Sequence, residues 1–272
     1  MVRHFLAPVP QKESKIDRDI ALVAQQIVKA GRNIVFTGAG ISTESGIPDF
    51  RSQGGLWDRY QPIYFADFMA SKEARIEYWR QKSAMYHDLI QARPNPAHLA
   101  LVELYDMGLL EAVITQNIDG LHQQAGLPDD AVIELHGNTR RVRCMSCGQT
   151  ITDHEAQQRI EAGDLAPECD CGGYLKPDTI SFGQSMPVQA TQQATNLSQS
   201  ADFFMVIGST LLVQPAASMP VYAKQCGAFL ALVNLSDTPC DGLCDALIRG
   251  KAGEVLPRIV AEVKERLGAD PN

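Results

Sequence analysis

The sequence lacks long apolar runs and an excess of positive charge, and each absence argues against a class of protein. No apolar run approaches the roughly 20 residues of a membrane span, and the apolar patch in residues 1–10 is too short for a signal peptide. Lys and Arg number 24 against 32 Asp and Glu. Nucleic acid or an anionic membrane is therefore not expected as the main partner, since phosphate binding requires concentrated Lys and Arg. We expect a cytoplasmic protein.

The chain has one small basic group, formed by Arg140, Arg141 and Arg143. Three arginines at this spacing are more typical of a solvated strand face than of a nucleic-acid site.

The sequence also lacks an even number of cysteines, because it has seven, and this number fits a disulfide scaffold poorly. Four of them form two close pairs with 21 residues between the pairs: Cys144 and Cys147, then Cys169 and Cys171. The spacing predicts a four-thiolate zinc site, although the second pair is tighter than usual and unrelated thiols are the alternative. Four thiolates leave no open position, so the zinc would be structural and would stabilise a module at 142–176. The other three are expected to be reduced thiols: Cys226, Cys240 and Cys244.

A glycine turn follows the apolar run at 33–36, but the third glycine of the dinucleotide fingerprint is absent. Gly38 and Gly40 predict a strand, a tight turn and a helix start whose N–H groups could bind phosphate. The fingerprint requires glycine where Thr43 stands. The turn alone is therefore also compatible with an ordinary strand-to-helix connection.

Strands and helices alternate along the chain. Strands are expected at 33–37, 111–115, 132–135, 179–182, 203–207, 229–233 and 246–248. Helices are expected at 14–31, 95–105, 188–200, 216–226 and 254–267. This alternation predicts an α/β fold, a Rossmann-like parallel sheet with helices on both faces, in a discontinuous domain at 14–141 and 177–268.

Residues 52–95 interrupt the expected alternation, because they show helical rather than strand patterns. Their position directly after the glycine turn allows two interpretations. The segment is either a lid over a bound cofactor or a cover for an exposed sheet face.

Small or amide-bearing residues follow five of the expected strands. In an open α/β sheet, ligands bind outside the carboxyl ends of the strands, so these residues converge on one site. Asn117 and Asp119 lie two residues apart and could hold a ribose or a carboxamide, although such residues are commonly turn formers. His136 follows an apolar strand and could act as a general base, although a structural role is the commoner one for a single histidine. His98 and His122 are expected to be structural.

With these residues in view, the chain resembles the sirtuins, a family of NAD-dependent protein deacylases, over about residues 20–265. The motifs that carry the resemblance lie at 38–51, 115–122, 135–137 and 208–211, together with the cysteine pairs. It implies one structural zinc per chain, bound NAD, and acylated-lysine proteins or peptides as substrates. The products would be free lysine, nicotinamide and O-acyl-ADP-ribose.

The resemblance also implies residue roles. His136 would be the general base and Asn117 a second catalytic residue. Substrate would lie along Ile180, Ser181, Phe182 and Gly183. The residues implied in NAD binding are Gly38, Ala39, Gly40, Ile41, Asp49, Phe50, Arg51, Gln116, Asn117, Ile118, Asp119, Gly208, Ser209, Thr210, Asn234, Leu235 and Ala252.

The chain departs from the family pattern near the substrate. Ser181 stands where many members have Trp, and Gln184 replaces a usual Glu. The acid-selective subgroup pairs a Tyr with an Arg three residues on, but Tyr78 is followed by Gln81 at that spacing, so a carboxylate clamp is unsupported. Acetyl is the expected acyl group. The alternatives are protein mono-ADP-ribosyl transfer and a catalytically idle NAD-sensing or peptide-binding module.

Overall fold

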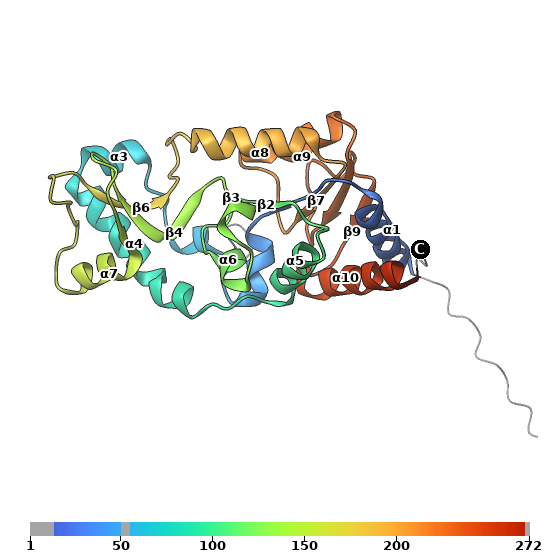
Figure 1. Ribbon diagram of the computed structural model, residues 1–272. Coiled ribbons are helices and arrows are strands. Elements are labelled where there is room, and N and C mark those ends of the chain that lie inside the picture. The colour runs from blue at the N-terminus through green and yellow to red at the C-terminus, as the bar shows by residue number, and fades with distance from the viewer. Residues whose placement is uncertain (1–13, 50–54, 270–272) are drawn as a thin grey trace, which may run out of the picture.

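The computed structural model describes residues 14–49 and 55–269, in which a large and a small sheet lie toward opposite ends of an elongated molecule (Figure 1). The larger sheet has six strands in the order β3-β2-β1-β7-β8-β9, and all neighbouring pairs are parallel. These strands are β1 (Asn33–Thr37), β2 (Ala112–Thr115), β3 (Val132–Glu134), β7 (Phe203–Ile207), β8 (Phe229–Val233) and β9 (Ala246–Ile248). The predicted parallel sheet is confirmed.

Helices cover both faces of this sheet (Figure 1). One face packs against α1 (Lys15–Lys29), α5 (Pro96–Asp106) and α10 (Ala252–Ala269). The other packs against α8 (Val188–Ser200) and α9 (Met219–Gln225), the latter preceded by the 3₁₀ helix η3 (Ala216–Ser218). Because side chains alternate along a strand, Val35 faces the first layer while Ile34 and Phe36 face the second.

The first helix illustrates why these segments form where they do. Ser14 and Asp17 form a capping box at the start of α1, which satisfies N–H groups that the helix itself leaves unpaired. Ile20, Val23 and Ile27 follow at helical spacing and are buried. The predicted helix at 14–31 is confirmed.

A second sheet has three antiparallel strands in the order β5-β4-β6. They are β4 (Gly137–Cys144), β5 (Thr150–Thr152) and β6 (Leu175–Thr179), with α7 (Asp153–Glu161) packed beside them. The strand expected at 179–182 was therefore wrong. The chain forms a strand earlier, because residues 175–177 pair with β4, a partner that local hydrophobicity does not reveal.

The small sheet extends beyond the module expected at 142–176, since its strands begin at Gly137 and end at Thr179. Between β2 and β3 the chain forms two short helices, the α-helix α6 (Leu121–Ala125) and the 3₁₀ helix η2 (Asp129–Ala131). The expected division into domains stays a prediction.

The described part of the insertion at 52–95 is helical and packs on the small sheet (Figure 1). It contains α2 (Leu56–Arg59), α3 (Phe65–Ala70) and α4 (Lys72–Gln91). Trp79 of α4 is buried against Val142 and Leu175, and its indole Nε1 donates a hydrogen bond to the Leu175 carbonyl at 3.1 Å. The described insertion thus covers the smaller sheet; closure over a cofactor stays a prediction.

Among the described residues, no helix combines the length and hydropathy needed to span a membrane.

Candidate functional site

The glycine turn after β1 fits directly against the turn after β7. Gly38 N–H donates to the Ile207 carbonyl at 3.0 Å, and Gly40 N–H donates to the Gly208 carbonyl at 2.8 Å. A Cβ on Gly40 would lie 2.7 Å from Gly208 Cα, and a Cβ on Gly208 would lie 2.4 Å from Ile41 N. Only glycine allows the two backbones to approach so closely.

The missing third glycine has a structural explanation. The turn continues as the 3₁₀ helix η1 (Ala39–Ser45), not as the α-helix of the dinucleotide fingerprint. Thr43 Oγ1 donates to the Gly40 carbonyl at 3.0 Å within this helix, so a side chain is accommodated there.

A cavity of about 220 Å³ lies at the carboxyl ends of the strands of the larger sheet. Many residues implied in cofactor binding or catalysis line it: Gly38, Ala39, Gly40, Asp49, Gln116, Asn117, His136, Gly208, Ser209, Thr210, Asn234, Leu235 and Ala252. The sequence reasoning missed seven further lining residues: Thr43, Glu44, Val213, Val233, Ser236, Gly250 and Lys251. Glu44 lies in η1, directly after the glycine turn, and Lys251 directly precedes α10, so a charge at each of these positions was the available signal.

Some expected contact residues lie elsewhere. Ile41 and Asp119 are buried and do not line the cavity, and Ile118 directs its carbonyl to Thr139 N–H at 2.9 Å. Phe50 and Arg51 lie outside the described residues.

Asn117 and Asp119 hold the glycine turn through hydrogen bonds to Gly38 and Ser42. Asn117 Nδ2 donates to the Gly38 carbonyl and to Ser42 Oγ, both at 3.1 Å, and Ser42 Oγ donates to Asp119 Oδ2 at 2.8 Å. Burial raises the pKa of Asp119, opposed by hydrogen bonds from Leu121 N–H and Ser42. The two side chains therefore hold the turn in place, with the Asn117 amide also at the cavity wall.

His136 lies immediately before β4, at the wall of the cavity. Its Nδ1 is 3.1 Å from the Gln116 carbonyl oxygen. A carbonyl only accepts, so we assign the proton to Nδ1, which leaves the Nε2 lone pair available. Burial lowers the pKa of His136, and the Gln116 hydrogen bond opposes this only in part. A neutral imidazole at pH 7 can act as a general base.

Gln116 also links two strand ends, because its Nε2 donates to Ser209 Oγ at 2.7 Å. One residue thus orients His136 through its carbonyl and Ser209 through its side chain.

The segment Ile180–Gly183 runs beside His136. Ile180 N–H donates to the His136 carbonyl at 2.9 Å, and the Phe182 carbonyl accepts from Phe65 N–H at 2.9 Å. The Phe182 ring is 42% exposed and lies 6.0 Å from the Tyr64 ring. The segment is thus held at both ends, next to the candidate base.

His98 and His122 are buried behind the site, as the expected structural role requires. Their ring centroids are 5.1 Å apart. His98 Nδ1 accepts from Asn95 N–H at 3.3 Å, and His122 Nε2 lies 2.9 Å from Thr37 Oγ1. Burial lowers the pKa of His98 to about 4; burial, with a smaller contribution from His98, lowers that of His122 to about 3.

These two histidines are expected to make the fold sensitive to acid. Below pH 6.5 the unfolded chain protonates both rings while the folded chain does not, so stability falls as pH falls toward about 4. Each ring contributes a slope of about 1.4 kcal/mol per pH unit. Denaturant unfolding between pH 7 and 4.5 measures it. His98→Asn and His122→Gln, which retain a polar atom near the bonded nitrogen, should each flatten the curve, whereas His154→Gln on the surface should not. Parallel curves for all proteins would contradict this assignment.

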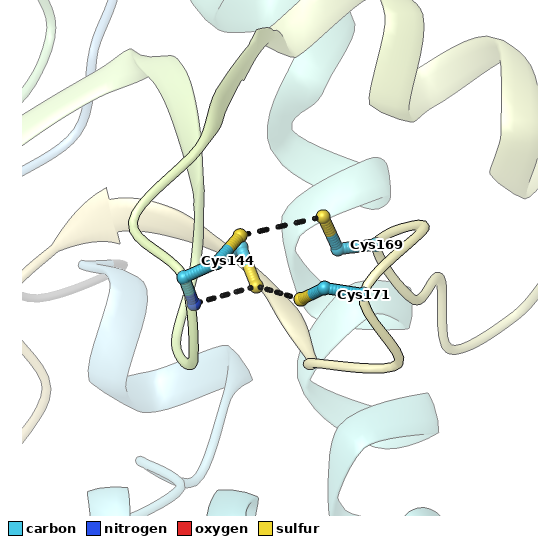
Figure 2. A group of neighbouring side chains, drawn as sticks. Cys144, Cys169 and Cys171 are labelled. Atoms are coloured by element: carbon cyan, nitrogen blue, oxygen red, sulfur yellow. Dashed lines mark hydrogen bonds between the residues drawn. The ribbon is translucent and has the colours of Figure 1, made fainter.

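The four paired cysteines come together at one end of the small sheet (Figure 2). Cys144 Sγ is 3.5 Å from Cys171 Sγ, and Cys147 Sγ is 3.8 Å from Cys169 Sγ. A tetrahedron of Zn–S bonds of about 2.3 Å has edges of about 3.8 Å, so these separations suit one zinc ion. The predicted cluster is confirmed as a site that could hold one zinc.

The loops around the cluster are built to fit it. The N–H groups of Ser146 and Cys147 lie 3.4 and 3.5 Å from Cys144 Sγ, where they favour a thiolate. A Cβ on Gly173 would lie 2.5 Å from the same sulfur, so only glycine fits there.

Several known proteins are similar to this chain over most of its length. Residues 38–215 match the model of the Sir2 family. NAD-dependent protein deacetylase 1 of Bradyrhizobium diazoefficiens is 48% identical over 244 residues, which cover 89% of this chain and 96% of that protein. NAD-dependent protein deacylase 2 of Archaeoglobus fulgidus is 43% identical over 251 residues, covering 92% and 98%. A solved Sir2–p53 peptide–NAD⁺ structure has a TM-score of 0.79 at 36% identity, covering 90% of this chain and 97% of that chain.

Proposed function

This chain belongs to the Sir2 family, and we propose that it removes acyl groups from protein lysine side chains in an NAD-dependent reaction. The proposal rests chiefly on one observation, that His136 lines the same cavity as the glycine turn. A module that only binds NAD has no need for a half-buried, neutral imidazole at this position. Relatives named NAD-dependent protein deacetylase or deacylase support the proposal.

In the proposed mechanism the glycine turn, with Ser209 and Asn234, binds NAD along the strand ends. The segment Ile180–Gly183 binds the acyl-lysine peptide beside His136. Bound NAD supplies an electrophilic ribose carbon, from which nicotinamide departs when the acyl oxygen attacks. His136 Nε2 would accept a proton from a ribose hydroxyl, whose oxygen bonds to the acyl carbon, and Asn117 would hold the glycine turn and the ribose in register. One water molecule is consumed as the bond between the acyl carbon and the lysine nitrogen breaks. The products are free lysine, nicotinamide and O-acyl-ADP-ribose.

Acetyl is the proposed acyl group, because the residues near Tyr78 do not present an arginine clamp. Arg80 pairs with Glu77 at 2.6 Å on an exposed helix face, and Gln81 Nε2 donates to Glu77 and to the Gln61 carbonyl. Tyr78 is buried, with its hydroxyl 3.3 Å from Thr179 Oγ1. Neither arrangement provides the bidentate arginine that would bind a carboxylate at the end of the acyl chain.

The zinc site is proposed to be structural, with all four positions filled by thiolates. Such a site requires reduced cysteines, and the cytoplasm maintains thiols in that state, so we place the reaction there.

The proposed function is tested by incubating the protein with NAD and peptides bearing acetyl, propionyl, succinyl or octanoyl lysine. Nicotinamide and O-acyl-ADP-ribose should appear in equal amounts, and only with an acylated peptide; the unmodified peptide is the matched control. Release of nicotinamide with none of the peptides would exclude deacylation of these groups. Transfer of label from NAD to protein, without O-acyl-ADP-ribose, would identify mono-ADP-ribosyl transfer instead.

A further inference from the structure

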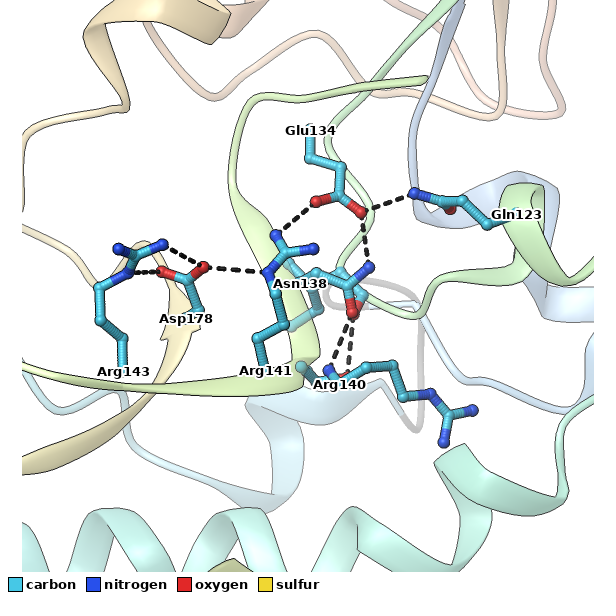
Figure 3. Close-up of polar contacts among 9 residues, drawn as sticks. Gln123, Glu134, Asn138, Arg140, Arg141, Arg143 and Asp178 are labelled. Atoms are coloured by element: carbon cyan, nitrogen blue, oxygen red, sulfur yellow. Dashed lines mark hydrogen bonds and ion pairs between the residues drawn. The ribbon is translucent and has the colours of Figure 1, made fainter. Parts of the chain in front are cut away.

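A chain of charged and polar side chains connects the larger sheet to the smaller one (Figure 3). Arg141 of β4 lies between two carboxylates: Nη2 donates to Glu134 Oε2 at 2.7 Å, and Nε donates to Asp178 Oδ2 at 3.2 Å. Glu134 belongs to β3 of the larger sheet, and Asp178 belongs to β6 of the smaller one. The arginine therefore links the two sheets.

Arg143 lies two residues further along β4. Among the ion pairs of the described residues, it pairs with Asp178 but not with Glu134. Its guanidinium donates to both oxygens of Asp178, at 2.9 and 3.2 Å, and makes no ion pair with Glu134. The Arg141 and Arg143 side chains are 46% and 45% exposed. The two arginines thus match in charge and exposure and both bond Asp178, but only Arg141 reaches the larger sheet.

The two carboxylates lie close to the candidate reaction site. Glu134 is two residues before His136, and Asp178 is two residues before Ile180. His136 and Ile180 are themselves joined by the 2.9 Å backbone hydrogen bond. The backbones of Gly137 and Asp178 also pack closely, because a Cβ on Gly137 would lie 1.9 Å from the Asp178 carbonyl oxygen. The start of the substrate segment is therefore held beside His136 in two ways, by the backbone contacts and by the side-chain bridge through Arg141.

We infer that Arg141 is a positioning residue, which holds Ile180–Gly183 in register with His136 by bridging Glu134 and Asp178. The inference rests on the proposed function for its kinetic consequence, but not for its structural one. Other polar contacts hold each carboxylate in place. Gln123 Nε2 donates to Glu134 at 2.8 Å, and burial, which would raise the pKa of Asp178, is outweighed by hydrogen bonds from Arg143 and Arg141 that lower it. Without Arg141, Gln123 and Asn138 still bond Glu134 and Arg143 still bonds Asp178, so loss of Arg141 removes only the bridge between the two carboxylates.

The contribution to overall stability is expected to be small, because a pair with this exposure is screened by solvent. The expected effect of losing Arg141 is on the position of the substrate, because a displacement by a fraction of an ångström reduces productive binding.

The test compares Arg141→Met with the matched control Arg143→Met. Arg141→Met should raise KM for the acetyl-lysine peptide about tenfold, whereas Arg143→Met should raise it less than about threefold. KM for NAD should stay within about twofold in both, because neither residue lines the cavity of the glycine turn. Arg141→Lys, which retains the charge but reaches one carboxylate at a time, should give an intermediate peptide KM.

Hydrogen exchange supplies a readout that needs no catalysis. The Ile180 amide should exchange faster in Arg141→Met than in wild type or Arg143→Met, because its acceptor is the His136 carbonyl. Equal exchange and equal peptide KM in the two methionine variants would overturn the inference, as would a parallel rise of KM for NAD and peptide. A wild-type protein without deacylase activity would overturn the proposed function, while the exchange comparison would still decide the role of Arg141. If Arg141→Met does not fold, Arg141→Lys against Arg143→Lys decides it by the same measurements.

Discussion

Replacing His136 with alanine is expected to lower kcat/KM for an acetyl-lysine peptide by about 10²- to 10⁴-fold, the usual contribution of a general base. The imidazole lines the cavity of the glycine turn, and its Nδ1 is engaged by the Gln116 carbonyl, so Nε2 is the atom left to accept a proton. Steady-state release of nicotinamide measures the loss. His154→Ala, on an exposed face of α7, is the control and should stay within about twofold.

The same residue should set the acid limb of the pH profile. A base works only when unprotonated, so activity should rise with pH and level off once His136 has lost its proton. Because burial lowers the pKa of His136, the rise should be centred below 6.5. A limb centred above that value, or a His136→Ala activity within tenfold of wild type, would assign the base to another group.

Removing the metal is expected to unfold the small sheet. Structural zinc sites supply about 10–16 kcal/mol of apparent binding free energy, which is as large as the whole stability of a typical domain. Cys147→Ser should therefore reduce zinc from one equivalent to near zero, lower the thermal midpoint, and expose residues 137–179 to hydrogen exchange. Elemental analysis and calorimetry measure the first two effects.

Loss of zinc should also abolish activity, although a filled shell of four thiolates leaves the metal no part in the chemistry. The reason is that Cys144 ends β4 and Cys171 lies shortly before β6, the two strands that hold the substrate segment against His136. Cys226→Ser is the control, since Cys226 is exposed and outside the cluster. Full zinc content in Cys147→Ser, or far less than one equivalent in wild type, would show that the cluster is not a zinc site.

The structure also decides what the basic group at 140–143 does. Arg141 and Arg143 engage Glu134 and Asp178, and Arg140 pairs with Asp153 at 3.6 Å. Charges neutralised by neighbours in this way do not form a surface for phosphate backbones. The expectation from the sequence, a solvated strand face, missed that the charges connect two sheets.

Several features were determined by the sequence alone. The strands at 203–207 and 229–233 were predicted with correct bounds because a central parallel strand is buried on both faces, and an unbroken apolar run is its direct consequence. The four cysteines of the candidate metal site were found because the thiolates of a tetrahedral zinc site typically come as two pairs close in sequence, whatever the fold around them.

Only the tertiary structure decided which segments meet. Residues 175–177 pair with β4, and the sequence carries no sign of this because strand pairing depends on a partner distant in the chain. For the same reason, Arg141 could be recognised as a charged strand residue but not as the bridge between Glu134 and Asp178. Local sequence patterns reflect burial and side-chain chemistry, because these are properties of individual residues. Contacts between distant residues exist only once the chain has folded, and they place His136 beside Ile180.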